Sequence, residues 1–236
     1  MIVAVNQPYF APYPGFFYKA CLCDYFVILD DVQFPRGTTW ITRNRFKNDQ
    51  GTLWMTIPVW KKGLGLQRIG SVRICREGRW ARKHMESLRH AYANAPFIDK
   101  HLEFLKGIFE ADHEKIIDLN LEIIRYIVEC LEINTRIVLQ SELDASGTGD
   151  RLLIKICRQL GGTHFLAQGA TKKFVDENLM RQAGFLVRYF TPPRLTYPQL
   201  WGDYIANLST FDLMFNCGPK AGDIVRGKAL RLTIDD

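Results

Sequence analysis

The chain has 236 residues, which is enough for one generous domain or for a domain with a large insertion. With 47% hydrophobic and 24% charged residues it has the composition of an ordinary globular protein, which excludes disorder over most of its length. Much of the net charge of +6 comes from residues 36–89, and this basic region suits either an anionic ligand, such as a nucleotide sugar, a lipid-linked sugar or RNA, or a merely solvated face.

Short apolar runs alternate with helical patterns along the chain, which predicts a Rossmann-like α/β fold with a mostly parallel sheet. Within it we expect a β-hairpin excursion at about 40–75, in which residues 53–59 pair with residues 69–74. Helical spacing over about 79–131 predicts a helical insertion or subdomain within a single domain, 1–236. The five expected strands are 2–5, 25–29, 135–139, 164–167 and 185–190, and the remaining expected helices are 16–22, 151–160, about 172–183 and a last one capped by Ser209.

The first residues, MIVAVNQPYF, lack the basic and apolar regions of a secretory signal. No apolar run approaches the roughly 20 residues that span a bilayer. The six cysteines are scattered, and the nearest two have C-x-C spacing, so free thiols are expected rather than zinc ligands or disulfides. We therefore expect a cytoplasmic protein with no membrane span.

Polar residues follow almost every predicted parallel strand, and in such sheets ligands bind beyond the carboxyl ends of the strands. These strand ends are Asn6-Gln7, Asp30-Asp31, Gln140-Ser141, Gln168-Gly169 and Tyr189. As a set they favour a polar ligand, although any single one is compatible with an ordinary strand end.

Two of these segments have more specific chemistry. Residues 7–15 contain three prolines and one glycine, so the loop is preorganised either to present Gln7 to a ligand or simply to form a rigid turn. Asp30 and Asp31 could bind a divalent cation or act as a base, and a capping role is as reasonable for one of them.

Further candidates lie in the basic region and in the helices. Arg43 and Arg45 point to the same side of an extended chain, where they suit a phosphate or carboxylate or pair with surface acids. His84 shares a helix face with Trp80 and is an acid/base candidate, or a structural histidine. The predicted site is completed as follows: catalytic Asp30, Asp31 and His84; substrate-binding Gln7, Tyr9, Arg43, Asn44, Arg45, Asn120, Ser141, Gln168, Gly169 and Asn216.

The sequence has no Walker phosphate loop, no G-x-G-x-x-G fingerprint, no G-x-S-x-G elbow and no H-E-x-x-H motif. Its own motifs resemble those of the WbqC-like family in order and spacing over nearly the whole chain. They are Gln7-Pro8-Tyr9, Asp30-Asp31-Val32-Gln33, Trp40 with Arg43-Asn44-Arg45, Lys83-His84, Asn120, the 156–162 stretch ICRQLGG, Tyr197-Pro198-Gln199 and the run LSTFDLMFNCG at 208–218.

This resemblance implies a role in O-antigen or other surface-polysaccharide biosynthesis, with transfer of a glycyl, other aminoacyl or acyl group to an amino sugar. The expected partners are a nucleotide- or lipid-linked sugar and an acyl or aminoacyl donor, with nucleic acid only as a tRNA donor. In this interpretation Asp31→Asn removes most activity. The alternatives are an ATP-dependent ligase or nucleotidyltransferase, for which Mg²⁺ would be the cofactor, and a non-catalytic sugar- or RNA-binding module.

Overall fold

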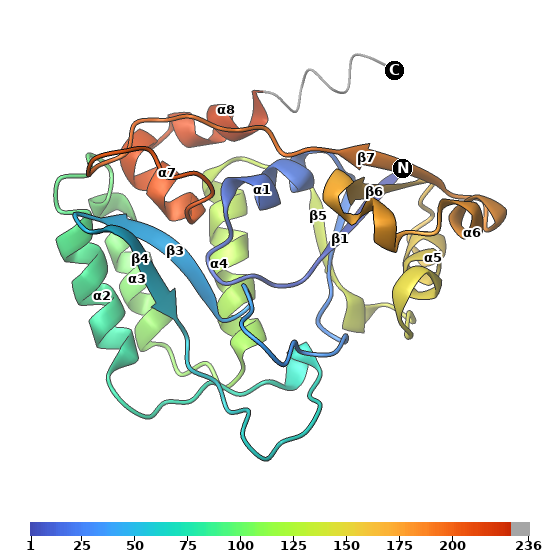
Figure 1. Ribbon diagram of the computed structural model, residues 1–236, viewed down its shortest axis with the longest axis horizontal. Helices are drawn as coiled ribbons and strands as arrows, with labels where there is room; N and C mark the ends of the chain where they lie inside the picture. The colour runs from blue at the N-terminus through green and yellow to red at the C-terminus, as the bar shows by residue number, and fades with distance from the viewer. Residues whose placement is uncertain (228–236) are drawn as a thin grey trace.

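A five-stranded parallel sheet forms the centre of the computed structural model, which describes residues 1–227 (Figure 1). Its order is β5-β2-β1-β6-β7, and every neighbouring pair is parallel. Because β1 is central, the chain extends the sheet first on the β2 side and later on the β6 side, and the loops after β1 and β6 diverge around a crevice. The predicted fold class and all five strands are confirmed: β1 (Ile2–Asn6), β2 (Tyr25–Ile28), β5 (Arg136–Leu139), β6 (His164–Gln168) and β7 (Leu186–Phe190).

The sheet is covered on both faces, as its uninterrupted apolar strands require. Val3, Val27 and Phe165 face helices α5 (Gly149–Gln159) and α6 (Glu177–Gln182). The alternate residues, including Ala4 and Phe26, belong to a larger hydrophobic core on the opposite face. That core is built with α1 (Pro14–Cys21), α4 (Ile116–Cys130), α7 (Thr210–Cys217) and α8 (Lys220–Arg226).

The predicted helical region, 79–131, consists of α2 (Trp80–Ala91), α3 (Asp99–Glu110) and α4. Buried residues of each helix, such as Leu88, Ile108 and Ile123, join the same hydrophobic cluster as Phe26 of the sheet. These helices therefore share a continuous core with the sheet rather than a core of their own.

The hairpin is present, but the pairing predicted for it was wrong. Strand β4 (Gly51–Thr56) pairs with the preceding β3 (Arg43–Asn48), while residues 57–75 are largely irregular and contain the short 3-10 turn η1 (Ile69–Ser71). Gly51 has φ +102°, which suits glycine and allows the chain to reverse within two residues, so the nearer partner forms the ladder. A single antiparallel bridge, Val59 to Ile74, links the two segments that were expected to pair.

Two helix boundaries depend on capping side chains. The helix expected at about 172–183 is two elements, the 3-10 helix η3 (Gly169–Phe174) and α6, because the carboxylate of Asp176 accepts two backbone N–H groups at 3.0 Å and starts a new helix there. The predicted cap of the last helix is confirmed, since the Ser209 hydroxyl accepts the N–H of Phe211 at 3.3 Å.

Candidate functional site

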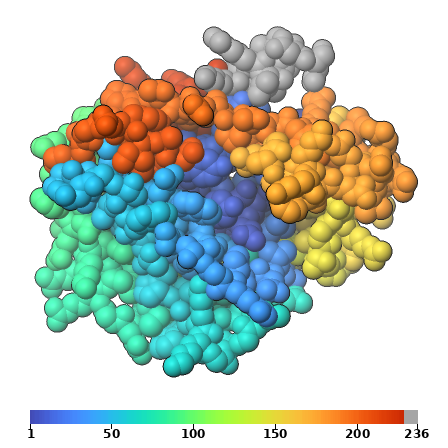
Figure 2. Space-filling model, in the orientation of Figure 1, coloured from blue at the N-terminus to red at the C-terminus, as the bar shows by residue number. Residues whose placement is uncertain are grey.

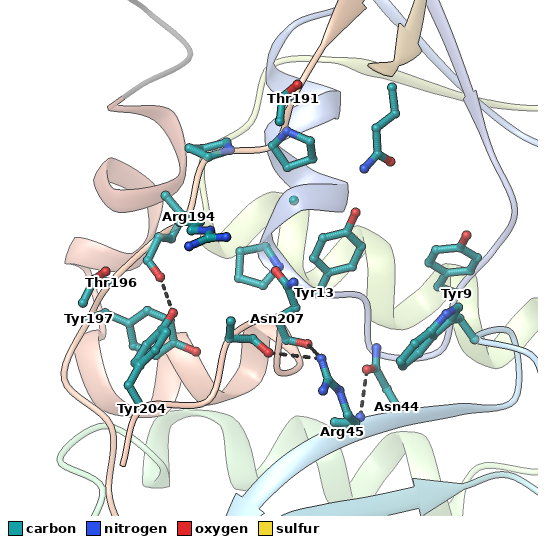
Figure 3. Close-up of a pocket in the computed structure, with 18 residues that line it drawn as sticks. Tyr9, Tyr13, Asn44, Arg45, Thr191, Arg194, Thr196, Tyr197, Tyr204 and Asn207 are labelled. Carbon is teal, nitrogen blue, oxygen red and sulfur yellow. Dashed lines mark hydrogen bonds between the residues drawn. The ribbon is translucent and has the colours of Figure 1, made fainter. Parts of the chain in front are cut away.

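A pocket of about 830 Å³ opens beyond the carboxyl ends of β1, β6 and β7, at the crevice predicted by the strand order. Figure 2 shows the surface hollowed over the dark-blue N-terminal residues, between the light-blue hairpin region and the orange segment near β7. Its walls come from the loop after β1, the end of β6, residues 191–197 after β7, residues 204–207, and Trp40 with the start of β3 (Figure 3).

Three buried polar side chains hold the loop that follows β1. The side-chain amide of Asn44 donates to two loop carbonyls, at 3.0 and 2.8 Å, and that of Asn120 donates to a third at 2.8 Å. The hydroxyl of Thr210 donates to a fourth at 2.7 Å. Since buried carbonyls must be paired, these contacts fix the loop and with it the rings of Tyr9 and Tyr13.

Tyr9 and Tyr13 line the pocket with hydroxyls that point the same way (Figure 3). A side chain at Gly15 would place its Cβ 2.4 Å from the Tyr13 ring, so glycine is needed there for this ring position. Burial raises the pKa of both tyrosines, and hydrogen bonding with Asn6 and Gln168 opposes that rise only in part. Both phenols therefore stay protonated near neutral pH, where they can donate hydrogen bonds.

The charged side chains in the pocket wall are all positive. The guanidinium of Arg45 donates through Nη2 to the carbonyls of Ala206 and Asn207, at 3.1 and 3.0 Å, while its buried Nε has no partner among the described residues. Arg194 is exposed and makes no hydrogen bond or ion pair with any of residues 1–227. Among the described residues, none of those that line the pocket is Asp, Glu, His, Lys or Cys. The pocket thus favours an anionic ligand.

A buried polar cluster anchors the segment that carries Tyr197. The Asp212 carboxylate is fully buried and accepts the hydroxyl of Tyr92 at 2.7 Å. Burial raises the pKa of Asp212, whereas the tyrosine hydroxyls and the charge of Lys47 oppose the rise. The Lys47 ammonium donates to the carbonyl of Asp203 at 2.6 Å, which ties residues 197–207 to the hairpin.

Four of the predicted substrate-binding residues line the pocket: Tyr9, Asn44, Arg45 and Gln168. Asn120 supports the wall from behind by holding the loop that also contains Gln7. Gly169 directly follows Gln168 at the start of η3.

The structure places Asp30 and Ser141 together, outside the pocket lining. The Asp30 carboxylate accepts the backbone N–H of Ser141 at 2.9 Å and its hydroxyl at 2.5 Å, which joins the ends of β2 and β5. The neighbouring Asp31 forms an ion pair with Arg68.

His84, Arg43 and Asn216 also lie outside the pocket lining. The His84 ring packs against Trp80, as expected for residues four apart on a helix, and its Nε2 lies 2.9 Å from the carbonyl of Thr56. Burial lowers the pKa of His84, so the neutral ring is favoured near pH 7. Arg43 stacks over a tryptophan of β4, and Asn216 donates to a carbonyl one turn earlier in α7, at 2.8 Å.

Much of the wall after β7 was missed by sequence reasoning. Thr191 directly follows a predicted parallel strand, so the strand-end rule could have identified it as a site residue. The other residues of this wall could not be predicted, because they follow the prolines at 192 and 193 in a stretch without a periodic pattern. The lining residues not predicted as site residues include Tyr13, Trp40, Thr191, Arg194, Tyr197, Tyr204 and Asn207.

Comparison with known proteins agrees with the motifs in the sequence. The model of the WbqC-like protein family matches residues 7–224. An uncharacterised protein of Mycobacterium tuberculosis is 30% identical over 227 residues, which cover 95% of this chain and 97% of that protein. None of the helices described for residues 1–227 is long and apolar enough to cross a membrane. With a match over nearly its whole length, the chain belongs to the WbqC-like protein family.

Proposed function

We propose that the pocket binds the phosphate-bearing part of a nucleotide- or lipid-linked amino sugar, and that the protein transfers a glycyl, other aminoacyl or acyl group to the sugar amine in surface-polysaccharide biosynthesis. The observation that carries the proposal is the pair Arg45 and Arg194 in a wall whose described residues include no carboxylate. Guanidiniums bind phosphate oxygens well because their fork of N–H donors matches the geometry of the anion.

In the proposed reaction, the amine nitrogen attacks the carbonyl carbon of an activated acyl donor. The C–N bond forms, the bond from that carbon to its oxygen or sulfur leaving group breaks, and the amine proton passes to the leaving group or to water. Arg45 and Arg194 would hold the phosphate, while Gln168 and the hydroxyls of Tyr9 and Tyr13 would orient the sugar. Holding two reactants in this way lowers the barrier by removing much of the entropy loss of a bimolecular step.

The residues first proposed as proton acceptors, Asp30, Asp31 and His84, do not line this pocket. Transfer at the pocket would therefore depend on holding the two reactants in place rather than on a side-chain base. On this view Asp31→Asn would retain most of the turnover. A large loss of turnover in a folded Asp31→Asn protein would instead support the original proposal that Asp31 is the base.

Magnesium does not fit the residues of this pocket. Mg²⁺ in nucleotide sites is held by one or two carboxylates together with substrate phosphates, and the described lining offers no carboxylate. Nor do any three His, Cys, Asp or Glu side chains within residues 1–227 gather where they could hold a metal ion. The ATP-dependent ligase thus receives no support from this pocket.

The same lining favours one alternative, a non-catalytic sugar-binding module. The described lining residues provide hydrogen-bond donors and two cations but no imidazole, thiol, amine or carboxylate for covalent or acid–base chemistry. Such a module would bind the same phosphorylated sugar without turnover.

Calorimetric titration with glucosamine 1-phosphate and with glucosamine tests the binding step. The phosphorylated sugar should bind more tightly, and Arg194→Ala should weaken it about tenfold to a hundredfold, the value of a charge-assisted hydrogen bond. Arg181→Ala, at an exposed position on α6 away from the pocket, is the matched control and should change nothing. Equal affinity for the two sugars would refute the anion site.

Mass spectrometry tests the transfer step. Nucleotide-linked amino sugars are incubated with aminoacyl-tRNA or acyl-thioester donors and examined for the mass gain of an amide. Binding without product under every donor would support the binding module.

A further inference from the structure

Two tryptophans stand exposed beside the pocket. Trp40 and Trp54 remain 41% and 43% exposed, and their rings stack with centroids 5.8 Å apart and planes 28° apart. Large aromatic side chains are usually well buried, so two adjacent exposed ones mark a contact surface. Trp40 also lines the pocket, so this surface continues the pocket wall.

Both tryptophans are flanked by guanidiniums. In the hairpin Arg45 lies directly opposite Trp54, and Arg43, two residues away on the same strand, projects from the same face. The Cζ atom of Arg43 is 3.7 Å from the centroid of Trp54, and that of Arg45 is 5.9 Å from the centroid of Trp40. We call these four side chains the Trp–Arg platform.

We infer that the Trp–Arg platform binds the nucleobase of a nucleoside diphosphate that carries the sugar, with the base stacked on Trp40 and the diphosphate on Arg45 and Arg194. This inference rests on the proposed function and specifies the carrier. Trp54 packs against Trp40 and supports it, so Trp40 offers its remaining exposed surface beside the pocket. Arg45 belongs to both the platform and the pocket, which places a phosphate-binding group next to a stacking surface.

Charge distinguishes a nucleotide from a lipid chain as the occupant. Any nucleobase can stack on tryptophan because every base has a π-face. The phosphates of the same nucleotide can pair with the neighbouring guanidiniums. A prenyl chain laid over the platform would cover Arg43 and Arg45 without replacing their hydrogen bonds to water, and such desolvation is unfavourable. The platform therefore favours a nucleotide-linked sugar over a lipid-linked one.

Isothermal titration with inorganic pyrophosphate and with the diphosphates of uridine, cytidine, adenosine, guanosine and thymidine tests the inference. At least one nucleoside diphosphate should bind about tenfold or more tightly than pyrophosphate. Trp40→Ala should remove that advantage, Trp54→Ala should reduce it, and Trp40→Phe should keep part of it. Trp60→Ala is the matched control, because Trp60 is equally exposed at 43% but lies outside the platform. Thermal unfolding of each variant identifies any that fails to fold.

Equal affinity for pyrophosphate and every nucleoside diphosphate would overturn the inference, as would equal losses in Trp40→Ala and Trp60→Ala. Preferential binding of a short RNA ending in CCA over all the diphosphates would overturn it in favour of a tRNA end. Glucosamine 1-phosphate separates this failure from failure of the proposed function. If that sugar binds through Arg194 while the diphosphates gain nothing from Trp40, the proposed function stands without the platform.

Discussion

Asn120 offers a direct test of whether the polar residues around the loop after β1 bind ligand or hold the loop. Its side chain is completely buried, and its amide donates to the carbonyls of Pro8 and Ile41, at 2.8 Å each. Replacing Asn120 with alanine leaves two buried carbonyls unpaired, and each such group costs about 1 to 3 kcal/mol. We therefore expect Asn120→Ala to lower the free energy of unfolding by about 2 to 6 kcal/mol.

Urea denaturation followed by circular dichroism measures this loss. Asn120→Asp keeps the shape but cannot donate when ionised, so it should destabilise at least as much and thereby separate lost hydrogen bonds from lost volume. The matched control is Asn216→Ala, because the Asn216 amide is only partly buried and donates within its own helix. That variant should stay within about 1 kcal/mol of the wild type.

Two results would refute this reasoning. A loss in Asn120→Ala no larger than that in Asn216→Ala would mean that the loop does not depend on the Asn120 amide. Unchanged stability together with lost binding of glucosamine 1-phosphate would return Asn120 to the role first predicted from the sequence, that of a ligand-binding residue.

Three further predictions concern titratable groups that are buried or partly buried. Burial lowers the pKa of Lys19 from 10.5 to about 8. Between pH 8 and pH 10.5 the unfolded chain therefore keeps a proton that the folded protein has released, so the free energy of unfolding rises with pH over this range. Relative to Lys19→Met, the wild type should therefore gain about 3 kcal/mol in unfolding free energy from pH 7 to pH 10.5, and a flat difference would contradict the shift. Asp30→Ala removes the acceptor for both hydrogen bonds from Ser141 and should lower the unfolding free energy by about 2 to 4 kcal/mol, whereas a stable but inactive variant would indicate a catalytic carboxylate. Because burial lowers the pKa of His84, the NMR chemical shifts of its ring protons should change with pH about a midpoint below the ordinary 6.5. A midpoint above 6.5 would contradict this and would indicate that a negative charge lies near the ring.

The parallel sheet was predictable because its strands are buried on both faces. Such strands appear in the sequence as continuous apolar runs, and FVI at 26–28 or HFLA at 164–167 stands out between polar or glycine-containing turns. The hairpin was not predictable in this way. Strand β3, RNRFKN, contains only one apolar residue, and one of its faces carries Arg43 and Arg45. Its Lys47 is buried because the ammonium donates to the carbonyl of Asp203, so no apolar residue marks that position in the sequence.

The candidate site was predictable where a strand end marked it. Gln168 ends β6, and Tyr9 follows β1 in a loop rich in proline, so the strand-end rule and local composition both indicated them. Arg194 lies in a stretch without regular structure, and only the chain path in three dimensions brings it across from Arg45 in the pocket wall. Sequence spacing cannot predict that these two residues line one pocket.

A polar residue in or behind the pocket wall can therefore have either of two roles, and its hydrogen bonds distinguish them. Asn44 and Asn120 have donors directed at backbone carbonyls, and Asp30 has both oxygens engaged by Ser141. The amide donors of both asparagines and the carboxylate of Asp30 are therefore used within the fold, while the Oδ1 atom of Asn120 is buried with no partner among the described residues. Arg194 has no partner among residues 1–227, and Arg45 lines the pocket with only its Nη2 engaged in hydrogen bonds to described residues, so both guanidiniums retain donors for a ligand. These two guanidiniums should accordingly determine which ligands the pocket binds, and they require an anionic group on the substrate.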